Sequence, residues 1–155
     1  MPKMKQVDPT EQIGRQLETT DDPTLLILRA HLLIEERLRD IVAGVCRSAD
    51  ELEPARLSFY QIFCLVRAIV GRSDEPGWVF VARLNAVRNR MAHHRDPGHW
   101  DELVGSVAAK LRAKYPRTKT AVERCRLAAF FACGYFDALR GSVRLLHAYA
   151  AEDEG

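Results

Sequence analysis

Residues 22–46 read DPTLLILRAHLLIEERLRDIVAGVC, and this stretch decides the fold class. Asp22 followed by Pro23 is a typical helix start, because an aspartate caps the first free amides and proline fits the first helical position. Apolar residues then recur at three- and four-residue spacing, which is the period of a helix with one buried face. We expect the buried stripe to hold Ile27, His31, Ile34, Leu38, Ile41 and Val45. The stretch therefore predicts one long helix that ends near Cys46.

The same spacing recurs along the rest of the chain, while the strict alternation of a strand does not occur. Ser58 is the expected N-cap of a second helix that ends at Gly71, and either Thr118 or Thr120 can cap the last helix. The second helix should bury Phe59, Ile62, Phe63, Val66 and either Ile69 or Val70. The further predicted helices cover residues 78–94, 100–115 and 121–149. The polar connection 47–57 is expected to include one short helical turn.

These elements predict an all-α fold, an up-and-down bundle of about five to six helices. Hydrophobic residues make up 47% of the 155 residues, which is enough for a core without disulfides or a metal. We expect a polar N-terminal segment over residues 1–21, a single helical domain over residues 22–150, and an acidic tail over residues 151–155 that frays.

Charge and cysteine usage limit the class of protein. The formal net charge is only +2, so nucleic-acid binding through bulk positive charge is excluded and any basic surface must be local. The four cysteines form no Cys-x-x-Cys pair and lie among apolar neighbours, which predicts reduced, buried thiols. No run reaches the roughly 18 apolar residues of a membrane helix, and the first 20 residues lack the apolar stretch of a signal peptide. We therefore expect a cytoplasmic protein that does not contact membranes.

The predicted helix 78–94 has three faces rather than two. Its core stripe consists of Phe80, Leu84, Val87 and Met91, and Arg83 and Arg90 share a charged flank. The third face consists of Trp78, Ala82, Asn85, Ala86, Asn89 and His93. Small and uncharged polar residues allow another helix to approach closely. We expect this face to meet a partner, most simply the same helix of a second copy.

The segment Arg88-Asn89-Arg90-Met91-Ala92-His93 resembles the signature of the HEPN superfamily, whose name stands for higher eukaryotes and prokaryotes nucleotide-binding. In that signature an arginine precedes a polar residue, and a histidine follows the arginine after four intervening positions. The preceding segment 84–87 and the following His94 are similar to the form common in prokaryotic members. Segments 31–36 and 55–59 also resemble the helices before the motif in one uncharacterised bacterial group, so the resemblance spans roughly residues 22–94.

The resemblance implies a dimeric bundle in which two motifs form a metal-independent endoribonuclease site, without a cofactor. His93 would act as general acid or base, since its reference pKa near 6.5 suits both roles. Arg88 would hold the scissile phosphate, and Asn89 would orient the substrate or the imidazole. The residues expected to bind flanking RNA phosphates are Arg83, Arg90, His94 and Arg95. The resemblance also suggests a toxin or defence effector, with an antitoxin or a regulatory protein as partner.

A non-catalytic alternative stays open, because relatives that resemble the mannitol operon repressor serve as regulatory or protein-interaction modules. In that case Arg88 pairs with a carboxylate such as Glu35, and His93 closes the helix C-terminus. His31, on the buried stripe, is expected to be a core histidine with a nearby hydrogen-bond partner. The acidic and histidine residues around Pro97 lack the spacing of a zinc helix, so no metal site is predicted.

Two further groups of residues are compatible with more than one role. The basic run comprises Lys110, Arg112, Lys114, Arg117 and Lys119. It is either a solvated helix end or an extension of an RNA-binding surface. The aromatic cluster comprises Phe130, Phe131, Tyr135 and Phe136, and it is expected in the core or in a dimer interface.

Overall fold

The computed structural model describes residues 9–18, 20–71, 75–93 and 120–153, and every regular element in this part of the chain is helical. The elements are α1 (Pro9–Glu18), α2 (Pro23–Val45), the 3-10 helix η1 (Ala49–Leu52), α3 (Phe59–Val70), α4 (Pro76–His93) and α6 (Ala121–Asp153). The predicted all-α bundle is confirmed. The helix expected over residues 100–115 and the basic run after it lie outside the described residues.

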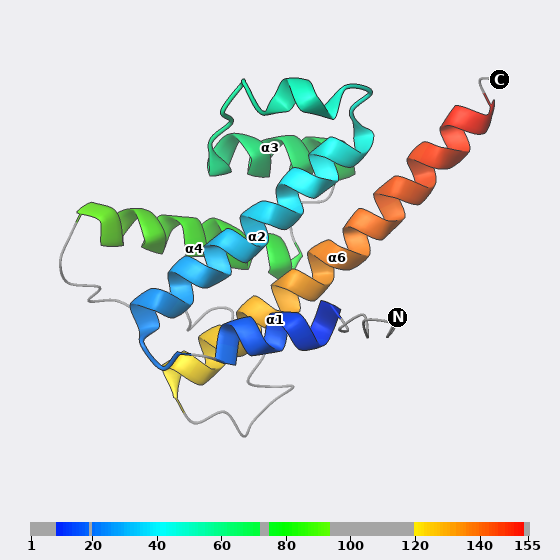
Figure 1. Ribbon diagram of the computed structural model, residues 1–155. Helices are drawn as coiled ribbons and strands as arrows, with labels where there is room; N and C mark the ends of the chain where they lie inside the picture. The colour runs from blue at the N-terminus through cyan, green and yellow to red at the C-terminus, as the bar shows by residue number, and fades with distance from the viewer. Residues whose placement is uncertain (1–8, 19, 72–74, 94–119, 154–155) are drawn as a thin grey trace, which may run out of the picture.

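Two long helices, α2 and α6, form the centre of the bundle, and Figure 1 shows them running in the same direction. α1 and α4 each contact both of these helices, whereas α3 packs on α2. The C-terminal part of α6, red in Figure 1, extends beyond the other helices. Its side chains Leu145, Leu146 and Tyr149 are exposed there.

Side chains from α1, α2, α3, α4 and α6 meet in one apolar core. Its largest fully buried members are Trp78 of α4 and Phe136 of α6, whose ring centroids lie 5.0 Å apart with nearly perpendicular planes. Such an edge-to-face pair adds attraction to the area that the rings bury. The Trp78 Nε1–H also donates a hydrogen bond of 3.0 Å to the Tyr135 hydroxyl. A Cβ atom at Gly77 would lie 3.0 Å from the Tyr135 ring, so glycine permits this close approach.

The helix ends follow the signals in the sequence. The Asp22 side chain accepts a hydrogen bond at the start of α2, and Ser58 forms a capping box at the start of α3. Gly71 ends α3 with φ 68°, a left-handed conformation that favours glycine. At the start of α6, Thr120 and Glu123 each accept a hydrogen bond from the other's backbone amide. Of the two candidate caps for the last helix, Thr120 is therefore the one used.

The predicted buried stripes are confirmed in α2 and α3, with one choice resolved. Five members of the α2 stripe are buried, and Val45 is partly buried against the core. In α3 the predicted residues from Phe59 to Val66 are buried. Val70 packs against the core, whereas Ile69 is 42% exposed.

The sequence predicts only a polar segment over residues 1–21, whereas α1 forms within it. Ile13 and Leu17 are the buried members of α1, and two apolar residues one turn apart make a weak helical signal. A tertiary contact adds to it, because the Arg126 guanidinium of α6 donates to the carbonyl oxygens of Leu17 and Thr20 at 3.1 and 2.8 Å. The bond to Leu17 satisfies a carbonyl that the end of α1 leaves unpaired. At the other terminus, the described part of α6 ends at Asp153.

The prediction of four buried cysteines is only half right. Cys125 and Cys133 of α6 are buried, and burial raises their thiol pKa values to about 12 and about 11. Cys46 is half-buried at the end of α2, and Cys64 is exposed on the outward face of α3. None of the described helices carries an apolar stretch long enough to cross a membrane.

Candidate functional site

α4 is anchored at its N-terminal half and carries the motif on its last turns. Phe80, Leu84 and Val87 are buried and Met91 is partly buried, which confirms the predicted core stripe. Trp78 is predicted on the partner face, but it is only 1% exposed and belongs to the core. The reason is that α6 covers a wider arc of α4 at this end, through Tyr135 and Phe136.

The remainder of the predicted partner face divides into an inner and an outer part. Asn85 is half-buried and turned toward α2, whereas Ala82, Ala86 and Asn89 are exposed. On the predicted charged flank, Arg83 is half-buried and Arg90 is exposed. The outer part is therefore a strip of small and uncharged residues beside two arginines.

Arg88 and Asn89 are both exposed, and their side chains form a hydrogen bond with each other. The Arg88 Nη1 donates a hydrogen bond of 3.3 Å to the Asn89 Oδ1. Within the described part of the chain, no carboxylate lies at ion-pair distance from Arg88. Among the described residues, Asn89 is the acceptor that Arg88 contacts, and a guanidinium has five N–H donors.

His93 is the last residue of α4, one turn after Asn89. Its side chain lies outside the described residues, as do all atoms of His94 and Arg95. Among the side chains that are described, no group of histidine, cysteine and acidic residues could hold a metal ion.

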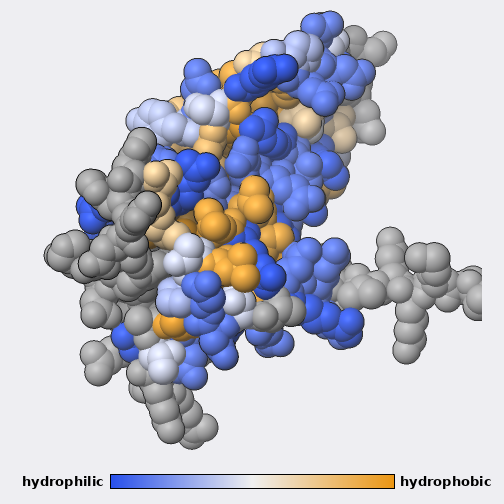
Figure 2. Space-filling view, turned by 60° about the vertical axis from the view of Figure 1, so that its left-hand side comes forward, coloured by the Kyte–Doolittle hydropathy of each residue, from blue (hydrophilic) through white to orange (hydrophobic). Residues whose placement is uncertain are grey.

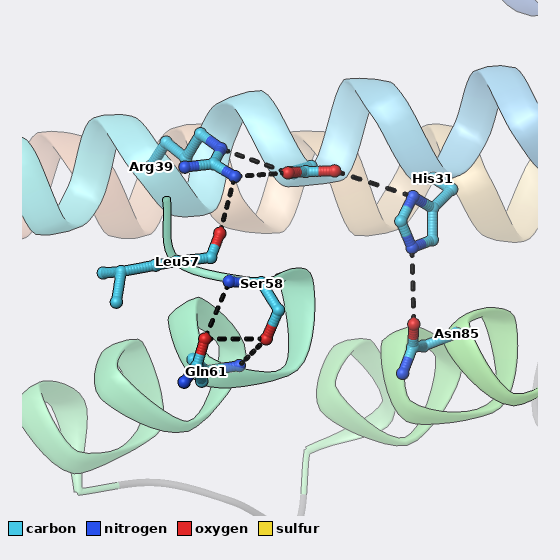
Figure 3. Close-up of polar contacts among 7 residues, drawn as sticks. His31, Arg39, Leu57, Ser58, Gln61 and Asn85 are labelled. Atoms are coloured by element: carbon cyan, nitrogen blue, oxygen red, sulfur yellow. Dashed lines mark hydrogen bonds and ion pairs between the residues drawn. The ribbon is translucent and has the colours of Figure 1, made fainter. Parts of the chain in front are cut away.

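Glu35, the predicted structural partner, is held by residues other than Arg88. Arg39 donates to its Oε1 from Nη2 at 2.6 Å and from Nε at 3.1 Å (Figure 3). Arg39 also donates to the carbonyl oxygen of Leu57 at 2.9 Å, which ties α2 to the loop before α3. The second Glu35 oxygen lies 3.8 Å from the His31 Nδ1. Glu36 is exposed, so the two adjacent glutamates differ in environment.

His31 is a core histidine with a partner, as predicted. It is 6% exposed, and its ring stacks on Phe59 with 4.0 Å between centroids. Figure 3 shows the imidazole between α2 and α4, where its Nε2–H donates to the Asn85 Oδ1 at 3.4 Å. Burial lowers the pKa of His31 below its ordinary 6.5, and the nearby charge of Arg88 adds to this effect. Asn85 and Glu35 act in the opposite direction without outweighing burial.

The sequence does not reveal two features of this region. The first is the pairing of His31 with Asn85, because a single helix wheel cannot identify contacts between residues far apart in sequence. The second is a stripe of exposed leucines on the first half of α2, formed by Leu25, Leu28 and Leu32, the last of them 64% exposed. This part of α2 comes forward in Figure 2, where apolar side chains gather in the middle of the face. It is also the part that contacts α4 through His31.

No family model, curated protein or solved structure matches the chain. The resemblance to the HEPN superfamily therefore depends on the sequence pattern, with Arg88, Asn89 and His93 at its centre.

Proposed function

We propose that the chain is a metal-independent endoribonuclease whose site consists of Arg88, Asn89 and His93 from two copies of the chain. The observation that carries this proposal is the state of Arg88. Its side chain is exposed, is bonded to Asn89, and has no carboxylate partner among the described residues. The planar donors of a guanidinium suit a pair of phosphate oxygens.

The proposed chemistry needs only the residue types of this motif. A base removes the proton from the ribose 2′-hydroxyl, and the 2′-oxygen bonds to phosphorus while the bond from phosphorus to the 5′-oxygen breaks. An acid returns one proton to the leaving 5′-oxygen, so the products are a 2′,3′-cyclic phosphate and a 5′-hydroxyl. His93 takes the acid or base role, and Arg88 stabilises the charge that grows on the phosphate.

Two surface features support a composite site between copies. The exposed leucines of α2 form an apolar stripe on the part of α2 that contacts α4 through His31, and contiguous exposed apolar surface marks interaction sites. The alanines Ala82 and Ala86 leave room for a close helix approach. Arg83 and Arg90 flank the strip and supply charge for adjacent phosphates.

The same leucine stripe favours a second candidate, a non-catalytic module that binds a regulatory protein. In that case the stripe binds the partner and the motif shapes the interface. The two functions differ in one measurable property, because only the first cleaves RNA. A role as a toxin or defence effector, with an antitoxin as partner, would follow from the endoribonuclease function.

The deciding experiment is single-turnover cleavage of mixed RNA in the presence of a chelator, with product ends analysed for cyclic phosphate. We expect wild type to cleave and His93→Ala to lose cleavage by at least about 100-fold, the size typical of acid–base catalysis. His147→Ala is the matched control, because it removes an exposed histidine on α6. Absence of cleavage by wild type would contradict the nuclease proposal and favour the regulatory module.

A further inference from the structure

A polar contact fixes α4 against α2 just before the motif. The imidazole Nε2–H of His31 donates to the Asn85 Oδ1 at 3.4 Å, and the two residues lie 54 positions apart. On α4, Arg88 and Asn89 follow Asn85 by three and four positions, so all three lie on neighbouring parts of the helix surface. A rotation of α4 that moved Asn85 would also move both motif residues.

Phe59 and Asn85 restrain the His31 ring, and Glu35 lies beside it. Phe59 of α3 stacks on one face of the imidazole. Glu35 lies 3.8 Å from Nδ1, and its other oxygen is fixed by Arg39. Figure 3 shows the resulting chain of contacts from the loop before α3, through α2, to α4. The stacking on Phe59 and the hydrogen bond to Asn85 therefore hold the imidazole in one orientation.

Burial favours the uncharged form of His31. The groups that face it are Asn85 and Arg88 from α4, Glu35 from α2, and Phe59 from α3. Burial is the largest influence and opposes protonation, as does the positive charge of Arg88, whereas Asn85 and Glu35 favour protonation without outweighing burial. An uncharged imidazole can lie beside the guanidinium without repelling it.

We infer that His31 is a positioning residue for the proposed RNA site: through Asn85 it fixes the rotation of α4, and with it the places of Arg88 and Asn89. The inference rests on the proposed function for its consequence in catalysis. It adds a residue outside the motif, on another helix, to the set that the reaction requires. A displacement of about 1 Å at such a site costs up to about 100-fold in rate.

Two substitutions separate positioning from simple loss of packing. His31→Gln keeps a donor that can reach the Asn85 oxygen, whereas His31→Leu removes the donor and keeps an apolar side chain. Val42→Ala is the control for stability, since Val42 is buried in α2 three turns from His31. All variants are compared at a temperature at which each is fully folded.

The first measurement is NMR of the Arg88 Nε–H and the Asn89 carboxamide, which does not depend on RNA cleavage. We expect both signals to shift in His31→Leu and to stay near their wild-type positions in His31→Gln and Val42→Ala. The second measurement is single-turnover cleavage, where His31→Leu should lose about 10-fold to 100-fold and His31→Gln should stay within about 3-fold.

The outcomes distinguish this inference from the proposed function. Unchanged Arg88 and Asn89 signals in His31→Leu would overturn the positioning role, as would equal losses in His31→Leu, His31→Gln and Val42→Ala. If wild type cleaves no RNA, the nuclease proposal fails. The NMR comparison then still decides whether His31 positions Arg88.

Discussion

Two polar clusters lie on different sides of α2, and they are built differently. Toward α6, Arg37 is 9% exposed and donates to Asp137 at 3.1 Å and to the Leu33 carbonyl oxygen at 2.8 Å. Arg140 continues this cluster, because it lies 3.4 Å from Asp137 and donates to Asp40 at 2.7 Å. Each of these charges has an opposite charge beside it.

In the cluster toward α4, the charges are paired differently. His31 and Asn85 share a bond of 3.4 Å without a net charge, and Arg88 remains exposed beside them without a carboxylate among the described residues. Buried charges must be paired because their desolvation is costly, and the α6 side meets this requirement. On the α4 side, Arg88 has no ion-pair partner in the part of the chain that the structure describes. The first arrangement holds helices together, and the second is compatible with the proposed role of Arg88 in phosphate binding.

The largest expected effect is on the α6 side. Asp137→Ala leaves Arg37 buried with no compensating charge, so we expect the free energy of unfolding to fall by about 3 kcal/mol. Chemical denaturation measures this loss. Asp40→Asn is the control, because the pair of Asp40 with Arg140 is more exposed and should contribute less than about 1 kcal/mol. Equal losses in the two variants would show that the burial of Arg37 does not determine the loss in free energy of unfolding.

The next effect is a pH dependence on the α4 side. The pKa of His31 is lowered in the folded protein from its ordinary 6.5, mainly by burial. The unfolded chain therefore binds more protons below pH 6.5, and the contribution of His31 to stability is complete above that pH and is lost as pH falls through the lowered pKa. We expect wild type to lose more stability than His31→Gln between pH 7 and pH 5, measured by denaturation at each pH. Parallel curves for the two proteins would contradict this assignment.

Local signals predict much of the fold, because caps and periodicity act within one helix. Asp22, Ser58 and Gly71 mark helix ends where the structure has them. The N-terminal helix α1 escapes prediction, since two buried residues and a contact from Arg126 of α6 stabilise it. Its start is nonetheless visible in retrospect, because Pro9 follows an aspartate as Pro23 does.

The candidate site is predictable in part for the same reason. A helix wheel places Asn89 on an outer face and Arg88 next to it, and both are exposed in the structure. The wheel cannot show which helix covers each end of α4. For this reason Trp78 and Asn85 are wrongly placed on the partner face, although α6 covers the first and α2 contacts the second. Contacts between distant segments decide these two positions.

The smallest expected effect on stability is that of Arg88→Ala. This substitution tests directly whether Arg88 and the buried Arg37 have different roles. The exposed Arg88 makes a 3.3 Å bond with its neighbour Asn89, so its loss should change the free energy of unfolding by less than about 0.5 kcal/mol. RNA cleavage should be lost all the same, whereas Arg144→Ala, which removes another exposed arginine, should change neither property. Arg37→Ala, unlike Arg88→Ala, should lower the free energy of unfolding strongly. If Arg88→Ala also unfolds the protein, Arg37 and Arg88 both stabilise the bundle, and the proposed role of Arg88 in phosphate binding is contradicted.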